Sequence, residues 1–182
     1  MPIVSSMPAA DEYQGFVSQL SARVRQARTS AVRSVNAELV SLYWDIGCEI
    51  DAKQRTLGWG DSVVERVAAD LRAEFPGMAG FSNANVWRVK QFYVAHTEPE
   101  FLAQLVRDLK RSDSTGKDRK APTAANLAQA VRDLVNAIPW GHHVFLLGRV
   151  NDPAARLYYL RATAAFGWSR SVLLNQVKAN AY

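Results

Sequence analysis

The sequence predicts an all-α fold: a helical domain with a long N-terminal helix and one or two helix-turn-helix units. Apolar residues recur at helical spacing through most of the chain. Four bulky aromatics, Trp59, Phe81, Trp140 and Trp168, stand immediately before residues that favour helix starts. The nearest strand signal, from 144 to 150, is flanked by helix caps. We therefore expect helices alone.

Size and charge restrict the class of protein. The chain has 182 residues, 48% of them hydrophobic, which is enough to bury a core. Its formal net charge of +5 favours an anionic partner. Nucleic acid is favoured over membrane, because no stretch approaches the roughly 20 apolar residues that cross a bilayer. The N-terminus lacks the pattern of a secretory signal, so a cytoplasmic protein is expected.

The first predicted helix extends from Asp11 to about Asp51, either as one long helix or as two nearly collinear ones, after a disordered N-terminus over 1–10. Its early part is basic, with no acidic residue between Tyr13 and Ala37. A solvated helix face explains this composition. The alternative is a strip that contacts DNA phosphates, for which we select Arg25 and Arg28.

A first helix-turn-helix unit is predicted within 59–96, completing a region that spans 11–110. One helix follows Trp59 and stops before Pro76, and Ser82 then caps a second helix over 83–93. Val86, Val89 and Tyr93 fall on its inner face. The outer face holds three side chains that match base edges in a major groove: Asn85, Arg88 and Gln91. Lys90 is expected to contact phosphate, although all of these are also ordinary exposed-helix residues.

The remaining sequence predicts a flexible basic linker over 111–122 and a second helical unit over 123–182 that packs on the first. Thr123, Gly141, Asp152 and Ser169 are the expected helix starts. In the last helix Leu173 and Val177 face the core. Arg170 and Lys178 face outward, and both are assigned to phosphate contacts.

No catalytic residue, metal site or cofactor is predicted. Adjacent histidines such as His142 and His143 point about 100° apart on a helix and do not share an ion. We expect His142 at a helix start and His143 packed locally. Phosphate-binding loops and nucleophile elbows are both missing from the sequence.

Several motifs in a fixed order give the chain a family resemblance. They are Asn36-Ala37-Glu38-Leu39-Val40, Tyr43-Trp44-Asp45-Ile46-Gly47, Gly58-Trp59-Gly60, Phe75-Pro76-Gly77, Gly80-Phe81-Ser82, Gln91-Phe92-Tyr93, Ile138-Pro139-Trp140-Gly141-His142-His143, Arg156, Tyr158-Tyr159 and Gly167-Trp168-Ser169-Arg170. From about Val17 to Val177 the chain resembles the N-terminal domain of the YhcG-type family of predicted nucleases. The resemblance implies a helical, DNA-binding domain that in relatives precedes a PD-(D/E)xK nuclease-like domain.

The sequence shows no counterpart of that nuclease domain, so we expect a non-enzymatic, bacterial DNA-binding module. The resemblance implies a nuclease domain or subunit as a partner and hints at defence against foreign DNA. The alternative function is a protein-interaction or oligomerisation module without direct nucleic-acid binding. In that case the long first helix would form a homodimer through an exposed seam of Leu39, Leu42, Tyr43 and Ile46.

Overall fold

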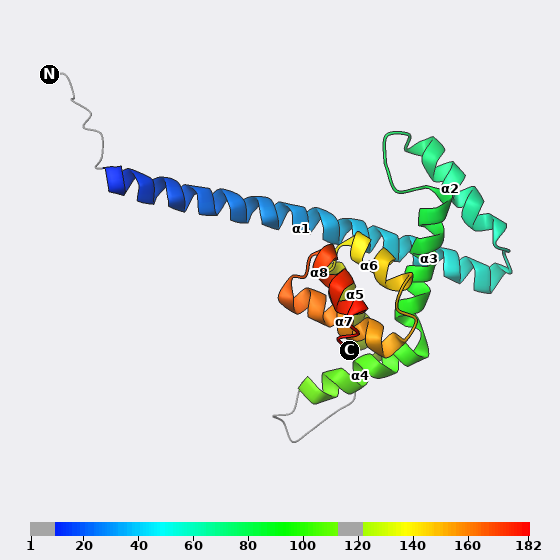
Figure 1. Cartoon of the computed structure of the whole chain (residues 1–182). Helices are drawn as coiled ribbons and strands as arrows, with labels where there is room; N and C mark the ends of the chain where they lie inside the picture. The colour runs from blue at the N-terminus through cyan, green and yellow to red at the C-terminus, as the bar shows by residue number, and fades with distance from the viewer. Residues whose placement is uncertain (1–9, 113–121) are drawn as a thin grey trace. The chain divides into compact units, whose positions relative to one another are not determined.

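The computed structural model describes residues 10–112 and 122–182, and within these ranges all regular elements are helices (Figure 1). The helices are α1 (Ala10–Leu57), α2 (Ser62–Glu74), α3 (Asn83–Thr97), α4 (Pro99–Ser112), α5 (Ala124–Asn136), α6 (Trp140–Leu147), α7 (Pro153–Phe166) and α8 (Arg170–Lys178). The all-α prediction is confirmed for this part of the chain. The predicted disorder over 1–10 and the predicted linker over 111–122 lie almost wholly outside the described residues.

Contacts between residues divide the chain into two compact units. Unit 1 ends at Val35, and its described part is the first half of α1. Unit 2 begins at Asn36 and contains the rest of α1 together with α2 to α8. Within unit 2, α4 packs against α7 and α3 packs against α6. Helices from both sides of 113–121 therefore build one compact body.

The main core of unit 2 is aromatic at its centre. The ring of Phe92, which is fully buried, meets four other rings edge-on. The centroid distances are 5.7 Å to Trp44, 4.9 Å to His96, 5.3 Å to Trp140 and 4.7 Å to His143. Aliphatic side chains from α4 to α8, including Leu105, Val135, Leu146, Leu157, Leu160 and Leu173, complete this cluster. Burial of this apolar surface is the main stabilising term of the fold.

Four predicted helix starts are confirmed by their capping bonds. Ser82, Thr123, Asp152 and Ser169 each accept a hydrogen bond from the backbone N–H three residues further on. Helix α7 ends at Gly167, which adopts the left-handed conformation with φ of 63° that glycine tolerates.

One predicted start differs from the structure. The helix expected to begin at Gly141 begins at Trp140 instead, with Pro139 in the capping position. The Pro139 carbonyl accepts the N–H of His142 at 2.9 Å, while Asn36 of α1 accepts the Trp140 backbone N–H at 3.3 Å. This second, long-range contact is invisible in the local sequence. Asp61 precedes α2 but makes no side-chain capping bond.

The exposed seam expected on α1 is wrong. Tyr43 is 3% exposed and shares a buried cluster with Phe81 and Val89, and Leu39 and Ile46 are partly buried against the same cluster. Leu42 alone of the four is exposed. The helical period marks an apolar face, but it does not say whether that face is covered by the same chain.

A buried arginine joins the start of α7 to the end of α3. Arg156, 6% exposed, donates to the backbone oxygens of Val150, Ala95 and Asn151 at 3.3, 2.9 and 3.1 Å. Its Nη1 also donates to Glu98 Oε1 at 3.0 Å. The guanidinium thus satisfies three carbonyl groups and one carboxylate at a junction of separate segments.

Candidate nucleic-acid interface

The connection between α2 and α3 is held by side chains of both flanking helices. Arg72 Nη1 donates to the Phe81 carbonyl at 2.7 Å and to Asn83 Oδ1 at 2.9 Å. Gly80 lies in this connection with φ of 114°, and a Cβ atom there would stand 2.2 Å from the Tyr43 hydroxyl oxygen. Only glycine fits both the backbone angle and the close approach. The start of α3 is therefore a fixed position.

Asn85, which the sequence places on the outer face of α3, is used by the fold. Its Nδ2 donates to the Gly80 carbonyl at 2.7 Å, and its Oδ1 accepts from Trp140 Nε1 at 3.0 Å. Burial raises the pKa of Tyr43, and Asn85 hydrogen-bonds to that side chain as well. The carboxamide is thus engaged with α6, α1 and the turn, and a contact with a base edge would have to replace these bonds.

Few residues of α3 are exposed on its outer face. Val86, Val89, Phe92 and His96 are all buried, so the helix has more neighbours than its periodicity indicated. Arg88 and Gln91 are exposed as predicted. Lys90 is only partly exposed, with its Nζ 3.6 Å from Asp61 and 5.3 Å from the centre of the Trp87 ring. These two contacts neutralise part of its charge locally.

The connection between α7 and α8 is short and is held by a hydrogen bond from α6. It consists of Gly167, Trp168 and Ser169, and the His142 ring of α6 donates its Nε2–H to the Trp168 carbonyl at 2.9 Å. A three- or four-residue turn containing glycine is typical of helix-turn-helix units. Since Leu173 is buried, α8 has a fixed rotation about its axis.

Because Leu173 faces the core, four polar residues of α8 face outward. Arg170 and Lys178 are exposed at its two ends, and Ser171 and Asn175 are exposed between them. This agrees with the outer face expected from the sequence. In unit 1, Arg25 and Arg28 are exposed on α1. Of the proposed DNA contacts, therefore, Arg88, Gln91, Arg170, Lys178, Arg25 and Arg28 are exposed, whereas Lys90 is half-buried and Asn85 is engaged.

The three histidines are interior groups. His96 and His143 are 1% and 0% exposed, and their rings lie 5.5 Å apart. His143 Nε2 donates to the Val135 carbonyl at 2.9 Å, and His96 Nδ1 donates to the Phe92 carbonyl at 2.7 Å. Burial lowers the pKa of His143 to about 4, and burial also lowers the pKa of both His96 and His142. At neutral pH the three rings are uncharged. As expected, His142 lies in the first turn of α6 and His143 is packed locally.

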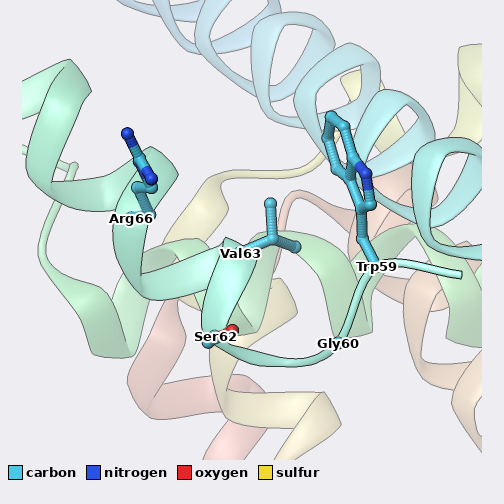
Figure 2. Close-up of a pocket in the computed structure, with 5 residues that line it drawn as sticks. All are labelled: Trp59, Gly60, Ser62, Val63 and Arg66. Atoms are coloured by element: carbon cyan, nitrogen blue, oxygen red, sulfur yellow. The ribbon is translucent and has the colours of Figure 1, made fainter. Parts of the chain in front are cut away.

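A surface hollow of about 600 Å³ lies where α1 passes into α2. Figure 2 shows Trp59 and Arg66 on either side of Val63, with Gly60 and Ser62 below them. Trp59 is 45% exposed, and Arg66 has Asp70 at 3.9 Å. The lining contains one cation and an indole but no acid-base pair, so it suits contact with a flat or anionic group. The sequence assigned Trp59 to packing, and nothing in the local pattern showed its exposure.

Over 10–112 and 122–182, no group of three or more His, Cys, Asp or Glu side chains is arranged to hold a metal ion. Within those same ranges, no helix combines the length and apolar character needed to span a membrane.

Comparison with known proteins identifies the class of this helical fold. The sequence matches the family described as DUF1016 N-terminal domain over residues 19–115 and 122–182, and the chain belongs to that family. It is also 26% identical over 174 residues to a protein of Escherichia coli (strain K12) named "Putative nuclease YhcG". That similarity covers 93% of this chain but 46% of the other protein, so the chain spans about half the length of this curated relative. No solved structure is significantly similar.

Proposed function

We propose that this chain is a DNA-binding helical domain that acts as the non-catalytic part of a bacterial, cytoplasmic nuclease or DNA-defence system. The name of the E. coli relative supports an association with nuclease activity. Because the similarity covers 46% of that relative, we assign hydrolysis to another domain or subunit. DNA binding would then be the contribution of this chain.

The observation that supports DNA binding most directly is the outer face of α8. After a three-residue turn, this short helix exposes Arg170, Ser171, Asn175 and Lys178 while Leu173 anchors it in the core. In a helix-turn-helix the second helix enters the major groove with its N-terminal residues toward the bases. Arg170 occupies the first position of α8, where the backbone N–H groups also favour a phosphate.

Helix α3 supplies a second set of candidate contacts. Arg88 is exposed and forms no ion pair or hydrogen bond within the described residues, so its guanidinium is available to phosphate or guanine. Gln91 is exposed one turn further along. We leave Asn85 out of the proposed interface because both ends of its carboxamide are already bonded. Lys90 could contribute only after releasing Asp61.

In unit 1, Arg25 and Arg28 are the proposed phosphate contacts. Both are exposed on α1, and neither forms an ion pair within the described residues. Contacts of this type add affinity without sequence preference and weaken with salt. They therefore belong to the non-specific part of the proposed binding.

The test is a titration of fluorescently labelled random-sequence duplex DNA with the full chain across a salt series. We expect affinity to fall steeply as salt rises, because each phosphate contact releases about one counterion. Arg88→Ala, Arg170→Ala and Lys178→Ala should each weaken binding and reduce the salt slope by about 1. All three side chains are exposed, so the variants should remain folded.

Lys53→Ala is the matched control. Lys53 is also an exposed cation on a helix of unit 2, but it lies outside the proposed set, and its removal should leave the slope unchanged. The proposal is wrong if the chain fails to bind duplex DNA at low salt. It is equally wrong if Lys53→Ala reduces binding as much as Arg88→Ala and Arg170→Ala do, because binding would then follow total charge alone.

A further inference from the structure

The helix of unit 1 has an exposed apolar face with a repeat of seven residues. The intervals along this face alternate between four and three residues, which is the spacing of a coiled-coil seam rather than of a helix on a globular core. The residues are Tyr13, Val17, Leu20, Val24, Ala27 and Ala31. Tyr13, Leu20 and Val24 are 48%, 42% and 57% exposed.

Within residues 10–35, the described part of unit 1, this face has no cover. That part is a single helix, so it contains no second element that packs on the seam. Helical segments in water are stabilised chiefly by burial of an apolar face, and such a face left exposed favours association. We therefore expect the seam to bind another helix that has an apolar face.

The distribution of charge favours one orientation of two copies. Asp11 and Glu12 begin the helix, whereas Arg23, Arg25, Arg28 and Arg33 follow without an acidic residue among them. In a parallel pair, Arg23 and Arg28 would occupy the flanking positions that face one another, which is repulsive. In an antiparallel pair with Leu20 opposite Val24, Arg28 faces Gln14 of the second copy and Arg23 faces Arg23, so one like-charge contact replaces two.

The sizes of the seam residues favour the same orientation. When Leu20 packs against Val24 of an antiparallel second copy, the next layers join Val17 to Ala27 and Tyr13 to Ala31. Each layer then combines a larger with a smaller side chain, which fills the seam evenly. A parallel pair would set Tyr13 against Tyr13 and Ala31 against Ala31. The antiparallel register also ends before Asn36, where unit 2 begins.

We propose that the Tyr13–Ala31 face of unit 1 binds a second copy of this chain in an antiparallel two-helix coiled coil. The paired segment is the helical part of unit 1, and the two copies of unit 2 follow it at opposite ends. This dimer does not depend on DNA binding, and nucleic-acid-free protein is the material on which it is tested.

The first test is sedimentation equilibrium of the full chain over a range of concentrations. We expect the mass to rise from that of one 20.2 kDa chain toward twice that value. Val24→Glu should hold the protein at the mass of one chain, whereas Val32→Glu should associate like the unaltered protein. Val32 is the matched control, since it is a 70% exposed valine of the same helix that lies off the seam.

The second test fixes the orientation by cross-linking in a Cys48→Ser background with a short bismaleimide. Ser21 and Gln14 occupy the same position in successive seven-residue repeats. In the antiparallel register the two copies of Ser21 lie about 3 Å apart along the axis, and the two copies of Gln14 about 24 Å apart. Ser21→Cys should therefore cross-link at least several-fold more than Gln14→Cys.

Three results would overturn the proposal. They are a single-chain mass for the unaltered protein at every concentration, equal loss of association in Val24→Glu and Val32→Glu, or equal cross-linking of Ser21→Cys and Gln14→Cys. The last result would indicate a parallel pair. Thermal unfolding of unit 2 should be unchanged in both glutamate variants, which separates loss of association from loss of folding.

Discussion

At the scale of single residues, the buried polar side chains determine how the helices meet. Asn85, His142 and Arg156 each bond to a partner on another segment, at sequence separations of 55, 26 and 61 positions among others. A buried polar group without such a partner would cost free energy. These three side chains therefore act as positional constraints within the apolar core.

His143 should make folding stability depend on pH. Its pKa falls from 6.5 in an unfolded chain to about 4 in the fold, so the unfolded state binds more protons between these values. Its contribution is complete above pH 6.5 and is lost as pH falls toward 4. Urea unfolding at several pH values should show a free energy that decreases by roughly 1.4 kcal/mol per pH unit for this group.

His143→Asn tests that assignment, because asparagine is polar but does not titrate. We expect the variant to be less stable at pH 7.5 and to lose less free energy between pH 6.5 and 4.5 than the unaltered protein. An unchanged pH slope in this variant would show that other groups produce the acid sensitivity. His96 shares the same core, and its pKa is also lowered by burial, so part of the slope should remain.

Arg156 should be among the least replaceable residues of the fold. Arg156→Ala leaves three backbone carbonyls and the Glu98 carboxylate without their donor, and we expect a loss of about 3–5 kcal/mol in the free energy of unfolding. Arg156→Lys should recover only part of this loss, since an ammonium lacks the planar fork. Arg149→Ala, at an exposed arginine of the same region, should change stability by less than about 0.5 kcal/mol. Equal effects at the two positions would refute this role.

At the scale of elements, α1 and α3 cross at a point where no side chain fits. A Cβ atom on Gly47 would stand 2.6 Å from the Val89 carbonyl oxygen and 2.8 Å from the Tyr93 Cβ. Neither neighbour is the flexible end of a side chain, so the helices themselves would have to separate. The close approach also brings Cys48 to Tyr93, whose pKa rises to about 12 through a hydrogen bond with the thiol and through burial.

Gly47→Ala should destabilise unit 2 by about 1–3 kcal/mol through overpacking. Gly141→Ala provides the matched comparison, because Gly141 is also helical and has nothing within 4 Å of its added methyl group. That change should be neutral or stabilising by up to about 1 kcal/mol, since alanine is the better helix former. Chemical denaturation measures both. A Gly47→Ala protein as stable as the unaltered one would disprove the tight crossing.

Local chemistry predicted the elements well, and long-range contacts account for what it missed. The caps at Ser82 and Ser169 could be predicted because each bonds to a backbone group three residues away. The start of α6 could not, because Asn36 of α1 fixes the Trp140 backbone from 104 positions away. The prediction that the Asn85 side chain is free on the outer face was wrong for the same reason, because its partner Trp140 lies 55 positions away. Arg88, Gln91 and the outer residues of α8 were predictable, since burial of Leu173 and Val89 sets the rotation of their helices.

At the scale of the whole molecule, α1 plays two roles that its sequence pattern does not separate. Apolar residues follow one another at similar spacing from Phe16 to Ile50. Those after Asn36, except Leu42, are buried or partly buried in unit 2, whereas those before it, except the partly buried Val17, are exposed. Periodicity indicates only that a helix face is apolar. The tertiary structure shows which part of that face is packed against other helices, and on α1 the packed part, which includes the buried Tyr43 cluster, begins after Val35.

The shared core of unit 2 has a consequence for how the chain is assembled. Phe92 and Phe101 precede residues 113–121, whereas His143, Leu157 and Leu160 follow them, and all belong to one interior. Neither stretch can form this interior by itself. A ribosome must therefore deliver the polypeptide at least as far as Leu160 before this interior can form cooperatively, and two separately produced fragments divided between α4 and α5 would be complementary halves of it.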